Sequence, residues 1–276
     1  MLRIIAGEFR RRLLLTPPDA EKTRPIPDRV KESLFGLLRG HCEGASVFDL
    51  FCGTGPIGLE AVSRGAARCV MVERDREVFK LLQQNVETLG VADRVELVLG
   101  DALGAGALAR CPRPVTLAFM DPPYPLVREP VGWGRVKAQF EKIIPLLTDD
   151  GFAVLRTPAP LFHEFNDAGE VQIQPDDEGV HEKRRKERGG GKRRDAARWL
   201  NEDEIADAMG AGGAGGEGDP FEDDEPVVEV KSAPVPVVPK GPEMRQELVD
   251  LKMAGAVGPE THVYHGMAVH LYMKAK

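Results

Sequence analysis

Short apolar runs recur along roughly residues 2–160, and polar or glycine-rich segments separate them. Between the runs, apolar residues recur at helical spacing, most clearly from Asp75 to Leu89. Strands that alternate with helices predict an α/β fold built on a mostly parallel sheet. The runs with the length and composition of buried strands lie near 46–51, 68–72, 94–99, 115–120 and 152–155.

The start of the chain carries a shorter pattern ahead of this core. Leu2 to Ile5 and Leu13 to Leu15 flank Ala6-Gly7, which predicts a small β-hairpin. A helix is expected to follow, with Asp28 as its N-cap. Its predicted apolar stripe consists of Val30, Leu34, Leu37 and Leu38.

A low-complexity segment interrupts the pattern from about Pro175 to Glu260. It begins with a basic run from Lys183 to Arg198, continues through a glycine-rich acidic stretch, and ends with Pro-Val repeats from Pro226 to Pro242. Such a composition cannot bury enough apolar surface to fold alone. We therefore expect an N-terminal hairpin and helix extension (1–40), a core (41–174), a disordered insertion (175–260) and a closing strand of the core sheet (261–276).

The charges are unevenly distributed along the chain, so the net charge does not describe its individual segments. The formal charge is −7, but Glu202 to Glu225 hold ten acids and no base, which leaves +3 for the rest. Met1 to Lys31 contain eight bases and four acids. A basic arm of this kind suggests phosphate contacts with nucleic acid, although a solvated polar face has the same composition. The candidate RNA-binding residues are Arg10, Arg11, Arg12, Arg24 and Arg29.

Composition also bounds the setting of the protein. No apolar run approaches the length of a membrane span, and the N-terminus lacks a signal-peptide pattern. Four cysteines lack metal-type spacing, so we expect free thiols, no metal site and a cytoplasmic location.

A glycine loop follows the first predicted strand. Gly53-x-Gly55-x-x-Gly58 has the spacing of a dinucleotide fingerprint, and Glu73 lies about 20 residues further on, where an acid binds ribose hydroxyls. A nicotinamide-dependent oxidoreductase is therefore one candidate. Asp49 argues for a different ligand, because a pyrophosphate avoids a nearby acid whereas a cation favours one.

S-adenosylmethionine combines a cationic sulfonium with an amino acid and an adenosine, and it suits this set of residues. Asp101 follows the third predicted strand and could meet the adenine amine, with Ala102 beside it. Any one of these acids could be an ordinary strand-end residue or a turn cap. These three acids fall at successive strand ends, and Asp121 falls at the fourth. This arrangement favours a ligand site, because ligands bind at the carboxyl ends of open α/β sheets. The expected cofactor residues are Asp49, Phe51, Gly53, Gly55, Glu73, Arg74, Asp101 and Ala102.

The turn Asp121-Pro122-Pro123-Tyr124 follows the fourth predicted strand. The Asp121 carboxylate and the Pro122 carbonyl can accept hydrogen bonds from an exocyclic amine. Tyr124 can stack on the ring that carries this amine. These three residues are the candidate catalytic set, and the turn predicts a methyltransferase that acts on amines.

The sequence resembles the RsmD family, the 16S rRNA guanine-N2 methyltransferases of the bacterial small ribosomal subunit. The resemblance covers about residues 2–160 and resumes in the segment from Tyr264 to Tyr272. The motifs that carry it are Arg3-Ile4-Ile5-Ala6-Gly7, Arg24-Pro25-x-x-Asp28-Arg29-Val30-Lys31-Glu32-Ser33-Leu34-Phe35, Asp49-Leu50-Phe51-Cys52-Gly53-Thr54-Gly55 and Asp121-Pro122-Pro123-Tyr124. The chain departs from the family at Ile26, where a threonine is usual, and in the insertion.

The resemblance implies a Rossmann-like class I fold that uses S-adenosylmethionine. Its sheet would be mostly parallel and seven-stranded, with a C-terminal antiparallel hairpin and a small N-terminal hairpin extension. The implied substrate is a guanine N2 amine of 16S rRNA or the small subunit. We expect a monomer, although the sequence leaves the oligomeric state open. Methylation of adenine N6 or of DNA, a nicotinamide oxidoreductase and a non-catalytic RNA-binding assembly factor remain as alternatives.

Overall fold

The computed structural model of the protein describes residues 2–17, 26–166 and 244–276. All of these residues belong to one of two compact units, which comprises Met1–Ile173 and Val235–Lys276. The basic run, the acidic stretch and the Pro-Val repeats of the sequence lie outside the described residues.

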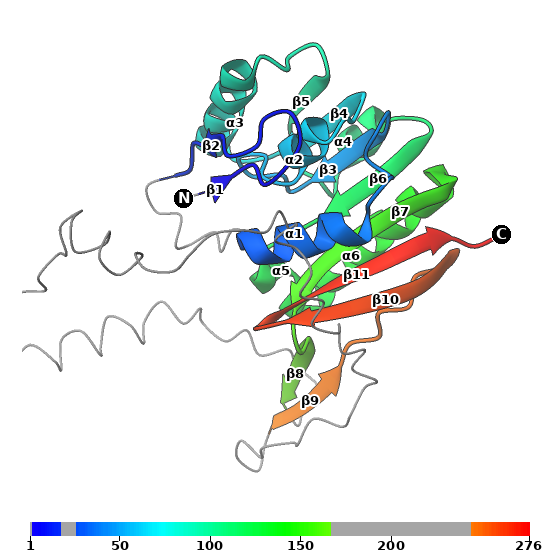
Figure 1. The fold of residues 1–276 in the computed structure, drawn as a ribbon. Coiled ribbons are helices and arrows are strands. Elements are labelled where there is room, and N and C mark those ends of the chain that lie inside the picture. The colour runs from blue at the N-terminus through cyan, green and yellow to red at the C-terminus, as the bar shows by residue number, and fades with distance from the viewer. Residues whose placement is uncertain (1, 18–25, 167–243) are drawn as a thin grey trace, which may run out of the picture. The chain divides into compact units, whose positions relative to one another are not determined.

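Seven strands form one sheet in the order β10-β11-β7-β6-β3-β4-β5 (Figure 1). The strands from β3 to β7 pair in parallel, whereas β7, β11 and β10 pair antiparallel. The mostly parallel α/β sheet and its C-terminal antiparallel hairpin are therefore confirmed. The strands are β3 (Ser46–Leu50), β4 (Arg68–Glu73), β5 (Val95–Leu99), β6 (Val115–Met120), β7 (Leu147–Pro158), β10 (Ala256–Tyr264) and β11 (Met267–Lys274).

Helices cover both faces of this sheet. On one face lie α1 (Asp28–Leu37), α2 (Gly58–Ser63) and α3 (Arg76–Leu89). On the other lie α4 (Ala105–Arg110), α5 (Tyr124–Arg128), α6 (Pro130–Ile143) and the 3-10 helix η2 (Ile144–Leu146). Each face has its own buried apolar cluster. Burial on both sides explains why the central strands are continuous apolar runs rather than alternating ones.

Two helix starts show how local chemistry sets the element bounds. Asp75 caps α3 as an N-cap should, because its Oδ1 accepts hydrogen bonds from the backbone N–H groups of Glu77 and Val78 at 2.8 and 3.0 Å. The expected Asp28 cap of α1 is wrong. Asp28 is already helical and makes no capping bond; its Oδ2 pairs with Arg3 Nε at 2.7 Å.

The apolar stripe of α1 also differs from the prediction. Val30, Leu34 and Leu38 are buried as expected, but Leu37 is exposed. Phe35 and the charged Lys31 are buried on this helix as well. The burial of a lysine on the inward face requires a partner, which α2 supplies.

The predicted N-terminal hairpin is present, although its strands are short. Strand β1 (Leu2–Arg3) pairs antiparallel with β2 (Leu13–Leu14). The loop between them approaches α2 so closely at Gly7 that a Cβ atom there would lie 1.9 Å from the Ser63 carbonyl oxygen. Only glycine fits this contact, and its φ of +83° favours glycine as well.

The second part of the chain contains order where disorder was expected. Strand β8 (Phe162–Asn166) pairs antiparallel with β9 (Met244–Leu248), and β10 begins at Ala256. The expectation of a disordered insertion is therefore wrong for 244–260, while 167–243 lie outside the described residues. The remaining domain boundaries stay predictions. None of the helices in the described part of the chain is long and apolar enough to cross a membrane.

Candidate active site

The site lies where the chain reverses its direction of winding. From β3 the chain adds β4 and β5 on one side, and then returns to place β6 on the other side of β3. In open α/β sheets this switch point leaves a crevice at the carboxyl ends of the strands. The predicted acids follow these ends: Asp49 in β3, Glu73 as the last residue of β4, Asp101 after β5 and Asp121 after β6.

Asp49 is fully buried at the base of the glycine loop. Its Oδ2 accepts a hydrogen bond from the Gly58 N–H at 2.9 Å, while Oδ1 has no partner among the described residues. Burial raises the pKa of Asp49 to about 8, the Gly58 bond works against this rise, and the charges of Asp121 and Glu73 add to it. The site thus contains a buried acid with an oxygen available to a donor or a cation.

The three glycines of the loop serve different purposes. Gly53, at φ +57°, would have nothing within 4 Å of an added Cβ, so its surroundings are open. A Cβ at Gly55 would lie 2.8 Å from Leu82 Cδ1, and one at Gly58 would lie 2.9 Å from Asp49 Oδ2. Gly53 therefore permits a ligand to approach the backbone, whereas the other two permit close packing. Helix α2 begins at Gly58, the last glycine of the loop.

Glu73 connects the loop to the next strand. Its Oε2 accepts from the Gly53 N–H at 3.0 Å, and its Oε1 accepts from the Asp75 N–H at 2.7 Å. Each oxygen retains acceptor capacity for a further donor such as a ribose hydroxyl. Phe51, which has a φ of +59°, is half-buried beside the loop, and Arg74 is exposed after Glu73.

Asp101 is exposed, and its partners shape the next loop. Its Oδ1 accepts from the Leu103 N–H at 3.0 Å, and Arg135 of α6 pairs with Oδ2 at 3.2 Å. Ala102 is buried, and the Gln139 amide donates to its carbonyl at 3.1 Å and to that of Gly104 at 3.3 Å. Gln139 thus holds the loop in place, a role that the sequence analysis missed; the signal is a glutamine at an inward position of a helix.

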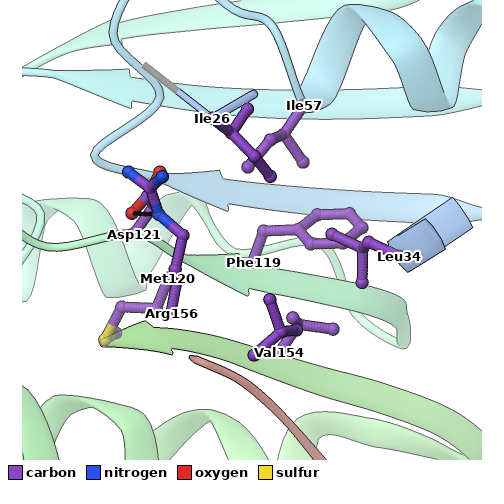
Figure 2. Close-up of a pocket in the computed structure, with 9 residues that line it drawn as sticks. Ile26, Leu34, Ile57, Phe119, Met120, Asp121, Val154 and Arg156 are labelled. Atoms are coloured by element: carbon purple, nitrogen blue, oxygen red, sulfur yellow. Dashed lines mark hydrogen bonds and ion pairs between the residues drawn. The ribbon is translucent and has the colours of Figure 1, made fainter. Parts of the chain in front are cut away.

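Asp121 is paired with an arginine that the sequence analysis also missed. Arg156 Nε donates to Asp121 Oδ1 at 2.5 Å, and the two side chains are 8% and 15% exposed. Figure 2 shows this pair at one end of a hollow. Burial raises the pKa of Asp121, and the Arg156 guanidinium works against this rise. The other residues that line the hollow are Ile26, Leu34, Ile57, Phe119, Met120, Val154 and Val269.

Tyr124 begins α5 directly after the buried Pro122 and the exposed Pro123. Its ring centroid lies 5.8 Å from the Arg156 guanidinium and 6.0 Å from that of Arg128. Both distances are in the range of cation–π contacts. Of the two arginines, Arg128 is exposed.

Comparison with known proteins identifies the family. The model of the family described as Conserved hypothetical protein 95 matches residues 2–160. The chain belongs to this family, the RsmD family. Ribosomal RNA small subunit methyltransferase D of Escherichia coli K12 is 36% identical over 151 residues, which are 55% of this chain and 69% of that protein.

Other relatives extend this result. The protein of the same name from Haemophilus influenzae is 30% identical over 168 residues, which are 56% of this chain and 86% of that protein. The structure of the yhhF protein of E. coli aligns with a TM-score of 0.55 at 22% identity, and covers 99% of this chain and 97% of that one. It shares the fold, which is the predicted Rossmann-like class I methyltransferase fold.

The RsmD-family segment around α1 has a structural role that its sequence did not reveal. Lys31 and Glu60 form an ion pair at 3.3 Å with both side chains fully buried. Lys31 Nζ also donates to the Arg3 carbonyl, and the Ser33 hydroxyl lies 2.7 Å from the Tyr264 hydroxyl. The segment therefore connects α1 to the N-terminal hairpin, to α2 and to β10.

The predicted RNA-binding arginines that the structure describes form no hydrogen bond or ion pair with the Asp121 turn. Arg10, Arg11 and Arg12 are exposed in the loop between β1 and β2, and Arg29 is exposed on α1. Within the described ranges, no hydrogen bond or ion pair connects these side chains with Asp121. Arg24 lies outside the described residues. Ile26, where the family usually has threonine, is buried in the wall of the hollow next to Asp121.

Proposed function

We propose that the chain transfers the methyl group of S-adenosylmethionine to the exocyclic N2 amine of a guanine in 16S rRNA, at guanine 966 of the small subunit. The observation that carries the proposal is the Asp121 carboxylate. Arg156 holds one of its oxygens at 2.5 Å, Tyr124 lies beside it, and the glycine loop of Asp49 follows the neighbouring strand. The names of the E. coli and H. influenzae relatives support rRNA of the small subunit as the substrate.

The residues at the glycine loop fit S-adenosylmethionine. Asp49 presents a buried carboxylate oxygen without a described partner, which suits a cationic ligand. Open space at Gly53 would permit the cofactor to lie against the backbone, and Glu73, which accepts from the Gly53 N–H, would accept from the ribose hydroxyls. Asp101 and the Ala102 segment, held by Gln139, would meet the adenine. The bound cofactor supplies a methyl group that its sulfonium already activates.

The task of the protein is then to align a poor nucleophile, because the guanine amine shares its lone pair with the ring. The Asp121 carboxylate and the Pro122 carbonyl would accept hydrogen bonds from the amino group and so direct its lone pair towards the methyl group. Placement at attack distance supplies a large part of the rate. The carboxylate also stabilises the positive charge that develops on the nitrogen. Tyr124 would stack on the base, which must leave its helix or loop to reach the site.

The decisive test is to identify the methylated nucleoside. Small-subunit particles from a strain that lacks the gene are incubated with the protein and S-adenosylmethionine, and their digested rRNA is analysed by mass spectrometry. We expect N2-methylguanosine, mapped to a single guanine. Methylated adenine would support the adenine-N6 alternative, and the absence of any methylated nucleoside would support a non-catalytic RNA-binding factor.

The assignment of Asp121 is tested by Asp121→Ala. We expect a loss of about 10²–10³-fold in kcat, because one electrostatic stabiliser of the transition state is removed. Binding of S-adenosylhomocysteine, measured by calorimetry, should stay near that of the wild type. Asp149→Asn is the control, since Asp149 is an exposed acid of β7 paired with Lys274 at 2.8 Å, and it should leave turnover unchanged. Near-normal turnover of Asp121→Ala would refute the role of this residue.

A further inference from the structure

We propose that Arg156 is a positioning residue, which orients the Asp121 carboxylate and the Tyr124 ring for the target amine. The inference rests on the proposed function and names a residue that acts through its neighbours. Arg156 lies in β7, and its guanidinium contacts the side chains of Asp121 and Tyr124, two of the three candidate catalytic residues.

The pairing follows from the register of the sheet. Met120 of β6 lies opposite Leu155 of β7, so the next residues, Asp121 and Arg156, emerge side by side. Arg156 Nε reaches Asp121 Oδ1 at 2.5 Å, and the guanidinium carbon lies 5.8 Å from the Tyr124 ring centroid. Figure 2 shows the guanidinium next to the carboxylate, at one end of the apolar hollow.

The two carboxylate oxygens of Asp121 are in different environments. Oδ1 is held by Arg156, whereas no described residue forms a hydrogen bond with Oδ2. An amine that approaches the turn therefore meets one acceptor with a fixed direction. Without the guanidinium, the carboxylate could rotate about its Cβ–Cγ bond, and the amine would lose its defined partner.

Arg156 also favours the ionised form of Asp121. Among the described residues, the charged and titratable groups that face Asp121 are Arg156 from β7, Asp49 from β3 and Tyr124 from α5, with Arg128 beyond the tyrosine ring. Burial raises the pKa of Asp121, and Arg156 is the cation that opposes this rise. A protonated Asp121 would be a weaker acceptor for an amine and could not stabilise a positive charge.

The experiment compares Arg156→Met and Arg156→Lys with wild type at saturating cofactor. For Arg156→Met we expect kcat to fall about 10²-fold, as for other misplacements of a reacting group. The acidic limb of the pH–rate profile should move to higher pH, while affinity for S-adenosylhomocysteine is kept. In Arg156→Lys the acidic limb should lie at the wild-type pH, because the ammonium keeps the positive charge. Only part of kcat should be recovered, because lysine lacks the planar guanidinium group and its several donors.

Arg68→Met is the matched control. Arg68 is also a strand arginine in an ion pair, 2.7 Å from Glu96, but it lies at the start of β4. We expect this variant to keep both kcat and the acidic limb. The inference fails if Arg156→Met, folded and with normal cofactor affinity, keeps the wild-type kcat and pH profile.

A second readout separates this inference from the proposed function. The Asp121 carboxyl titration is followed by carbon NMR in wild type, Arg156→Met and Arg156→Lys, without substrate. We expect Asp121 to titrate at higher pH in Arg156→Met than in the other two proteins, and an unchanged titration would overturn the inference. If wild type methylates no guanine, the proposed function fails while this titration still decides whether Arg156 controls Asp121.

Discussion

Asp49 lies in β3, and Asp121 directly follows the neighbouring strand β6. Asp49 is fully buried and the Asp121 side chain is only 15% exposed, yet the two acids have different partners. Asp121 has a guanidinium at 2.5 Å, whereas Asp49 has only the Gly58 N–H, and its second oxygen lacks a partner among the described residues. An arginine offsets the cost of a buried charge far better than one backbone donor does. Asp49 is therefore the carboxylate whose charge depends on the arrival of a ligand.

This difference predicts a pH dependence that originates in Asp49. Its pKa is about 8 in the folded protein and 3.8 for an unperturbed aspartate, so between these values the folded state holds a proton that the unfolded state has lost. The free energy of unfolding should therefore fall as pH rises from about 4 to 8, by up to about 1.4 kcal/mol per pH unit from this group. Asp49→Asn, which cannot ionise, should remove that part of the slope in denaturant titrations.

The same acid makes cofactor affinity depend on pH. Because the ionised form of Asp49 attracts a cation, affinity for S-adenosylmethionine should rise up to about pH 8, with proton release visible by calorimetry in different buffers. The control is Asp93→Asn, at an exposed acid, which should behave as wild type. An Asp49→Asn protein with the wild-type slopes of stability and affinity would show that Asp49 is ionised throughout.

The acids of the site could be predicted from the sequence, but their partners could not. Glu73 and Asp121 directly follow apolar runs, and the carboxyl ends of parallel strands meet at one edge. Arg156 and Gln139 come from a neighbouring strand and from a covering helix, so their contacts depend on register and helix rotation. Arg156 did leave a local signal, since it ends the apolar run from Phe152 to Leu155 inside a buried strand.

At the scale of elements, Glu60 of α2 joins three parts of the fold. Its carboxylate accepts from the backbone N–H groups of Ile5 and Ala6 at 2.7 and 3.0 Å, pairs with Arg64 at 2.8 Å and with Lys31 of α1 at 3.3 Å. Burial lowers the pKa of Lys31, and the Glu60 charge opposes this. The N-terminal hairpin, α1 and α2 therefore share one buried charge network.

Removal of Lys31 from this network should destabilise the folded protein. Among the described residues, Lys31→Met leaves the buried Glu60 carboxylate with only Arg64 as a cation, and we expect a loss of about 3 kcal/mol in the free energy of unfolding. Lys80→Met is the matched control, because Lys80 pairs with Glu77 at 2.7 Å on the exposed side of α3. Its cost should stay below about 1 kcal/mol. Equal costs in urea titrations would show that the buried network does not stabilise the fold.

Element types were predictable, whereas several bounds were not. The apolar runs gave all five parallel strands, and the spacing around Asp75 gave the start of α3. The start of α1 differs because Arg3, 25 residues away in sequence, takes the carboxylate that would have capped it. Strands β8 and β9 were missed because they pair across a long stretch of chain, whose composition suggested disorder up to Glu260.

At the scale of the whole molecule, the pairing of β8 with β9 joins the end of the described segment 26–166 to the start of the described segment 244–276. Phe162 lies opposite Leu248, and Asn166 lies opposite Met244, so the chain leaves and re-enters at neighbouring positions of one antiparallel pair. After β9, the chain continues into β10 and β11, and β11 pairs with β7 to complete the sheet. The core therefore needs residues 244–276. The pairing of β8 with β9 does not depend on the number of residues between 166 and 244.

This topology predicts that residues 167–243 can be replaced by a two-residue Asn-Gly turn, which suits a tight antiparallel connection. We expect the shortened protein to fold with a melting temperature within about 5 °C of wild type, since closing a shorter loop costs less entropy, and to keep its affinity for S-adenosylhomocysteine. The control deletion ends at 248 instead of 243, which removes β9 and leaves β8 without its partner. That protein should melt at a lower temperature. If the shorter deletion fails to fold while its control folds, the β8–β9 pair is not the junction that the core uses.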